Sequence, residues 1–169
     1  ELPHATWQAT ACVLNGRLYV MGGWVSSRLQ VLEMTEENGL SWSCKADLPA
    51  DRWGAASVVH EGRIWVMGGR ADNSDTASVI IYDAEADTWE AAPPLPMASG
   101  HGTAATIDGR ILLYGTHANL GHPDGLVFQY ENAAWSVLKE HCDLDKLTDA
   151  ADQDAIDKVY DDCKPLFAV

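Results

Sequence analysis

The apolar positions of this chain fall into short runs separated by turns, and the same arrangement occurs three times. Runs rich in small and β-branched residues cover 9–14, 55–60 and 102–107. Each run ends in a two-residue turn whose second residue is glycine: Asn15-Gly16, Glu61-Gly62 and Asp108-Gly109. Asn-Gly and Asp-Gly pairs accept the positive φ angles of a tight hairpin turn and are among the strongest hairpin signals. Each run therefore predicts a strand that folds back on itself.

Three further strands complete each copy. The strands that return from the turns are predicted at 17–21, 63–67 and 110–114, and the third strands at 29–34, 78–82 and 126–130. The fourth strands surround Trp42, Trp89 and Trp135. Short runs enriched in β-branched and aromatic residues between turn signals are typical of strands. The pattern predicts three units of four antiparallel strands.

The landmarks of the three copies keep one period. Leu2-Pro3 recurs as Leu48-Pro49 and as Leu95-Pro96, at intervals of 46 and 47 residues, and the closing tryptophans are 47 and 46 residues apart. Gly22-Gly23 recurs as Gly68-Gly69. Four short antiparallel strands in a period of about 45 residues are typical of a β-propeller blade. We expect blades at 1–46, 47–93 and 94–138.

On these residues the chain resembles the kelch-repeat family of β-propellers. The kelch pattern is an apolar strand, a turn, a strand that ends in a double glycine, and then a tyrosine and a tryptophan. The second copy fits best, with Arg52, Gly68-Gly69, Tyr82-Asp83 and Trp89 at the kelch positions. The first copy has Met34 in place of the tyrosine, and the third has Gly115-Thr116 in place of the double glycine. The resemblance implies an all-β fold, a partial kelch-type propeller of three four-stranded antiparallel blades.

Three blades leave a ring open. A blade buries its faces only against its neighbours, and closed propellers use about 4–8 blades. In the second and third copies the Leu-Pro pair links one blade to the next, so Leu2-Pro3 predicts a preceding blade. We expect the chain to be the C-terminal part of a longer propeller, or to receive further blades from another chain.

Residues 139–169 differ in character from the three copies. Apolar side chains recur there at steps of three and four, the spacing of one helix face: Leu144, Leu147, Ala151, Ala155, Val159 and Cys163. Aspartates cover much of the remaining surface. The pattern predicts an acidic amphipathic α-helical tail that lies against the third blade. A straight helix would hold Cys142 and Cys163 about 30 Å apart, too far for a disulfide, so free thiols are expected.

Charge narrows the range of partners. The chain has 11 basic and 25 acidic residues, a formal net charge of −14. Such a surface repels phosphates, which argues against nucleic acid, and no apolar stretch reaches the roughly 18 residues needed for membrane insertion. A protein partner with a basic or neutral surface is the expectation. Four scattered cysteines fit a reducing compartment and favour an intracellular location.

The sequence contains no catalytic signature. Neither Gly-x-Ser-x-Gly nor a phosphate-binding loop is present. Copper radical oxidases show that kelch-like propellers can hold a metal and an active site, so an enzyme or a sugar-binding propeller stays an alternative. His117, His122 and Asp124 have a spacing that a metal could use, and the tail resembles a calcium loop in which Thr148 replaces the required glycine. We expect no catalytic residue, no metal and no cofactor.

Binding on a propeller is expected at its loops. The alternation of strands places the loops between second and third strands on the same face as the loops between blades. Tryptophan and arginine are the residues most enriched at binding hot spots. The candidate partner-binding residues on this face are Trp24, Arg28, Arg52, Trp53, Arg70, Asn73, His117 and His122. Trp7 and Trp53 occupy matching places, so packing between blades is the alternative for these two.

Together these features predict a non-catalytic protein-interaction or scaffold module that is a subunit or fragment of a larger assembly. Two alternatives remain open. One is a kelch-type enzyme or a propeller that binds a sugar or another small molecule. The other is a structural adaptor that docks through the tail helix.

Overall fold

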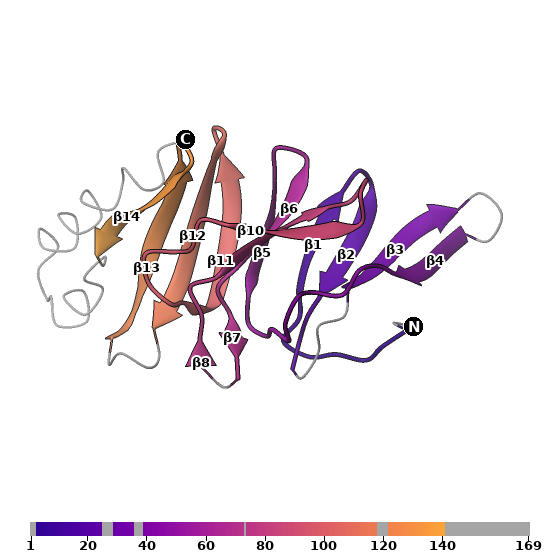
Figure 1. Cartoon of the computed structure of the whole chain (residues 1–169), viewed down its shortest axis with the longest axis horizontal. Helices are drawn as coiled ribbons and strands as arrows, with labels where there is room; N and C mark the ends of the chain where they lie inside the picture. The colour runs from indigo at the N-terminus through magenta and orange to yellow at the C-terminus, as the bar shows by residue number, and fades with distance from the viewer. Residues whose placement is uncertain (1–2, 25–28, 36–38, 73, 118–121, 141–169) are drawn as a thin grey trace, which may run out of the picture.

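The computed structural model describes residues 3–24, 29–35, 39–72, 74–117 and 122–140. All secondary-structure elements in these ranges are β-strands (Figure 1). No helix that could span a membrane occurs in the described part of the chain. The tail helix expected within 139–169 lies outside the described residues, apart from the last two residues of the final strand.

The strands form three four-stranded antiparallel sheets, which we call blades one, two and three. Blade one consists of β1 (Thr10–Leu14), β2 (Arg17–Met21), β3 (Leu29–Thr35) and β4 (Gly39–Cys44), in that order. Blade two consists of β5 (Ala56–His60), β6 (Arg63–Met67), β9 (Val79–Asp83) and β10 (Thr88–Ala92). Blade three consists of β11 (Gly100–Ile107), β12 (Arg110–His117), β13 (His122–Glu131) and β14 (Ala134–Glu140). The three four-stranded units predicted from the sequence are confirmed.

The first hairpin of each blade turns where the sequence places an X-Gly pair. Asn15 and Gly16 have φ angles of 50° and 73°, and the pairs at 61–62 and 108–109 have almost the same values. Two successive residues with positive φ match the right-handed twist of the flanking strands. The same turn therefore fixes the same register in all three blades.

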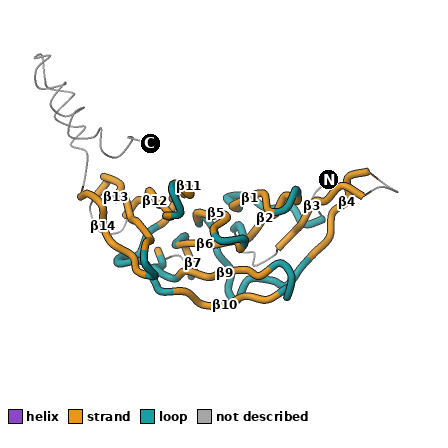
Figure 2. Tube along the Cα trace, turned by 90° about the horizontal axis from the view of Figure 1, so that it is seen from above, coloured by secondary structure: helices purple, strands orange, loops and turns teal. Residues whose placement is uncertain are grey.

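The blades are arranged as a fan. Figure 2 shows them along an arc, with the first strands β1, β5 and β11 on its inner side and β10 on its outer side. The first strands of adjacent blades lie next to each other. The hydroxyl groups of Thr10 and Ser57 are 2.6 Å apart, and the Thr106 hydroxyl donates to the carbonyl of Val59 at 2.8 Å. Polar contacts thus join the inner strands from blade to blade.

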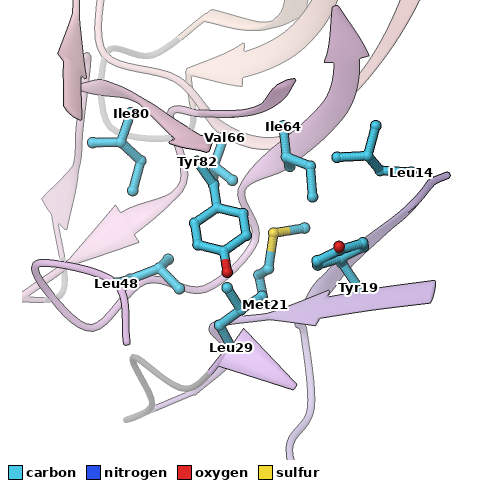
Figure 3. Close-up of a cluster of buried hydrophobic side chains, with 9 residues drawn as sticks. All are labelled: Leu14, Tyr19, Met21, Leu29, Leu48, Ile64, Val66, Ile80 and Tyr82. Atoms are coloured by element: carbon cyan, nitrogen blue, oxygen red, sulfur yellow. The ribbon is translucent and has the colours of Figure 1, made fainter. Parts of the chain in front are cut away.

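Apolar side chains fill the space between blades. In β6, Ile64 and Val66 pack toward blade one, while Trp65 and Met67 pack toward blade three, because alternate side chains of a strand point to opposite faces. The cluster between blades one and two, drawn in Figure 3, consists of Leu14, Tyr19, Met21, Leu29, Leu48, Ile64, Val66, Ile80 and Tyr82. Each blade is therefore stabilised mainly by its neighbours.

Candidate binding surface on the loop rim

Backbone hydrogen bonds join the loops at one end of the three blades. The N–H of Gly23 donates to the carbonyl of Arg52 at 2.7 Å, and the N–H of Gly69 donates to that of Ser99 at the same distance. Trp24 donates to Trp7 at 3.0 Å. The loops between second and third strands therefore lie beside the loops between blades, as predicted. We call this surface the loop rim (residues 6–8, 22–24, 51–54, 68–72, 74–76 and 99–101).

The double glycines permit this close approach. A Cβ atom at residue 23 would lie 1.7 Å from the Thr6 side-chain oxygen, and one at residue 69 would lie 2.9 Å from Ala55. The φ angles of Gly23 and Gly69, 118° and 87°, are also ones that other residues rarely adopt. The double glycine of the kelch pattern thus brings the loops of neighbouring blades together.

A continuous line of aromatic rings runs along the loop rim. The ring centroids of Trp7 and Trp24 are 5.4 Å apart, those of Trp24 and Trp53 are 4.8 Å apart, and those of Trp53 and His101 are 5.2 Å apart. We call these four residues the aromatic row. Trp7 is 60% exposed and Trp24 is 39% exposed, whereas Trp53 is half-buried. Large exposed aromatic side chains that adjoin one another are typical of an interaction surface.

Arg70 extends the aromatic row on one side. Its guanidinium carbon lies 4.9 Å from the centroid of the Trp53 ring, a cation–π contact. Its Nε atom is 3.3 Å from Oδ1 of Asp75, and both atoms are shielded from solvent, so charge rather than an aligned hydrogen bond holds the pair. A small hairpin of β7 (Arg70–Ala71) and β8 (Ser74–Asp75) carries both residues. Its first strand also pairs with Trp53 through two backbone hydrogen bonds of 3.2 and 2.8 Å.

Arg52 is not available on the loop rim, although the sequence suggested a partner contact. Its side chain is only 6% exposed, and Nη1 donates to the carbonyls of Gly68 and Ser78 at 3.0 Å each. Nη2 donates to the Ser78 hydroxyl. Burial lowers the pKa of Arg52 from its ordinary value. Arg52, the arginine of the kelch pattern, therefore stabilises the loops from the interior. The prediction that its side chain contacts a partner is corrected.

Of the seven other predicted residues, the structure brings three together and describes no side chain for the remaining four. Trp24, Trp53 and Arg70 are brought together in the aromatic row and beside it. Arg28 and Asn73 lie outside the described residues, and for His117 and His122 the structure describes only that they pair across β12 and β13. No group of three or more potential metal ligands occurs among the described residues.

Sequence reasoning missed two members of the aromatic row. Trp7 was left out of the candidate residues, with packing between blades as its alternative role, yet it is largely exposed and contacts Trp24. His101 was not selected. The signal that could have found both is the repeat itself, because Trp7, Trp53 and His101 follow one another at 46 and 48 residues, each at or just before the first strand of a blade.

Three fanned four-stranded sheets, joined by double-glycine loops, define the chain as a kelch-type β-propeller protein. A family comparison matches residues 1–150 to the KLHDC2/KLHL20/DRC7 Kelch-repeats domain. The chain belongs to this kelch-repeat family.

Comparison with solved structures supports the same fold. Among the 155 chains that match is YjhT, which superposes with a TM-score of 0.71 at 17% sequence identity. The alignment covers 83% of this chain and 53% of YjhT, so the chain spans about half the length of that protein. At this identity the likeness shows the fold alone. A search of the curated proteins gave no significant match.

Proposed function

We propose that this chain is a non-catalytic protein-interaction module of a larger assembly and that the loop rim is its docking surface. The aromatic row is the observation that carries the proposal. Its three tryptophans come from loops of blades one and two and His101 from the start of β11 in blade three, and two of the tryptophans present much of their surface to solvent.

The energetics of the row favour binding. A tryptophan can bury ~150–250 Å² at an interface, and burial of apolar surface stabilises a complex by roughly 25 cal/mol per Å². The rings of Trp7, Trp24 and Trp53 already contact one another, and hydrogen bonds fix the backbone beneath them. Because little freedom is left to lose, a partner would meet a surface already in its binding conformation.

The contacts of three described ionisable side chains on the rim favour binding over catalysis. Arg52 is buried against carbonyl groups, Arg70 is paired with Asp75, and His101 packs edge-on against Trp53. A general base or nucleophile needs a reacting partner within hydrogen-bond reach. The contacts of these three side chains stabilise the structure of the rim, as expected for a binding surface.

The test is affinity capture with the immobilised chain from an extract of cells that express it. We expect Trp7→Ala/Trp24→Ala to lose at least about tenfold of the specifically captured protein, as quantified by mass spectrometry, because two adjacent hot-spot side chains are removed. Tyr114→Ala is the matched control, since Tyr114 is a 48% exposed aromatic of blade three outside the loop rim. Equal capture by all three proteins would show that the rim is not the docking surface.

A further inference from the structure

Resting on the proposed function, we infer that the loop rim recognises cationic side chains, arginine above all, of an extended segment in a partner protein. A contact already present in the chain, that of Arg70 with Trp53, shows how the rim can bind a cation. Arg70 stacks on Trp53 and is paired with the carboxylate of Asp75. The chain thus already holds one guanidinium between an indole and an aspartate.

The neighbouring indoles offer the same chemistry to a partner. Trp7 and Trp24 continue the row beyond Trp53 and are 60% and 39% exposed. A guanidinium within about 6 Å of a ring centroid is attracted by the negative face of the ring. In an extended peptide, alternate side chains on one side are about 6.5–7 Å apart, and the long arginine side chain can adjust to the 4.8–5.4 Å steps of the row.

The negative charge of the chain and of its loop rim favours a positively charged ligand. Two exposed aspartates lie on the loop rim: Asp51, two residues before Trp53, and Asp72, two residues after Arg70 in the β7–β8 hairpin. The described arginines of the rim do not neutralise the charges of these two aspartates, because Arg52 is buried and Arg70 is paired with Asp75. With a formal net charge of −14 over the whole chain, the field attracts a basic segment and repels an acidic one.

The geometry of the row favours arginine over lysine. A guanidinium is planar and weakly hydrated, and it stacks on an aromatic face while its edges still donate hydrogen bonds to carboxylates. An ammonium group is compact and strongly hydrated, so transferring it onto an indole costs more. Nucleic-acid bases also stack on aromatic side chains, but their phosphates would meet the acidic surface.

Binding of labelled peptides to the full chain tests the inference. Four peptides of equal length alternate serine with arginine, lysine, glutamine or glutamate, and fluorescence polarisation measures their affinities at low and high salt. We expect the arginine peptide to bind most tightly, the lysine peptide about threefold to tenfold more weakly, and the other two not measurably. Binding of the arginine peptide should weaken at least about tenfold in Trp7→Ala/Trp24→Ala and should be unchanged in Tyr114→Ala.

A second pair of variants separates stacking from general attraction. Asp51→Asn/Asp72→Asn should weaken binding and reduce its salt dependence, whereas Trp24→Phe should retain part of the affinity because the ring face stays. If the arginine peptide binds equally without Trp7 and Trp24, it follows only the net charge and the inference is wrong. Equal binding of the glutamine or glutamate peptide, or no binding of any peptide, would also overturn it. None of these outcomes decides the docking role of the rim, which the capture experiment tests separately.

Discussion

Trp89 of blade two donates its indole N–H to the carbonyl oxygen of Ala46, in the segment that leaves blade one, at 2.8 Å. Blade three repeats this bond, with Trp135 donating to the carbonyl of Pro93 at 3.0 Å. Each of these tryptophans also packs on the kelch tyrosine of its own blade, with centroid separations of 4.9 and 5.1 Å. The closing tryptophan of the kelch pattern is therefore an anchor to the preceding blade.

Trp89→Phe is predicted to lower the free energy of unfolding by about 1–3 kcal/mol, through the lost hydrogen bond and the smaller buried ring. Trp42 is the matched control. It occupies the equivalent place in β4 of blade one, but its indole N–H makes no hydrogen bond to a described residue, so Trp42→Phe should cost less. Urea denaturation followed by circular dichroism measures both. Equal losses for the two variants would contradict the anchoring role.

A second prediction concerns Arg52. Arg52→Met should destabilise the chain by about 2–4 kcal/mol, because the buried carbonyl of Gly68 loses its Arg52 donor and the carbonyl of Ser78 keeps only the Gly68 N–H. Arg63→Met removes an arginine that pairs with Glu90 at the surface, where such pairs contribute about 0–1 kcal/mol. Thermal unfolding compares the two variants. A loss no larger for Arg52→Met than for Arg63→Met would contradict the structural role.

Much of the fold could be predicted because its signals are local. Asn15-Gly16 and its counterparts specify their turns from two adjacent residues, and the strands between turns follow from alternation. The position of Arg52 could not be predicted in this way. Its acceptors lie 16 and 26 residues away, and only the packed loops decide whether its side chain points inward. The exposure of Trp7 could not be predicted either. Its matching place with Trp53 left packing between blades open as an alternative, and only the path of its loop exposes the ring to solvent.

The thiol of Cys12 provides a third prediction. Burial raises the pKa of Cys12 to about 11, and the hydrogen bond with Ser57 offsets only part of this effect. At pH 8 about one thiol in a thousand would then be the reactive thiolate. Cys44 is exposed. We expect iodoacetamide to alkylate Cys44 at least about tenfold faster than Cys12 in the folded protein, measured by peptide mass mapping.

Denaturation serves as the control for the thiol experiment. In urea the two cysteines should react at similar rates, because burial no longer distinguishes them. Alkylation of Cys12 as fast as that of Cys44 in the native chain would show that the inner strands open readily.

The last prediction concerns the face of blade one that points away from blade two. Leu14, Tyr19 and Met21 point toward blade two, so the alternate residues of β1 and β2 lie on the opposite face. There Val13 pairs with Leu18 across the strands and Ala11 pairs with Val20, and Val13 is 61% exposed.

An extended apolar sheet face of this kind rarely stays bare on a monomer, because covering it removes apolar surface from water. We therefore expect the 169-residue chain, expressed alone, to self-associate or aggregate in a concentration-dependent way. Val13→Lys should reduce this association, since it places a charge in the middle of the face, whereas Ala86→Lys adds the same positive charge in an exposed turn of blade two and should not. Sedimentation velocity over a range of concentrations distinguishes the variants. A wild-type chain that sediments as a monomer throughout and melts in one sharp transition would show that this face needs no cover.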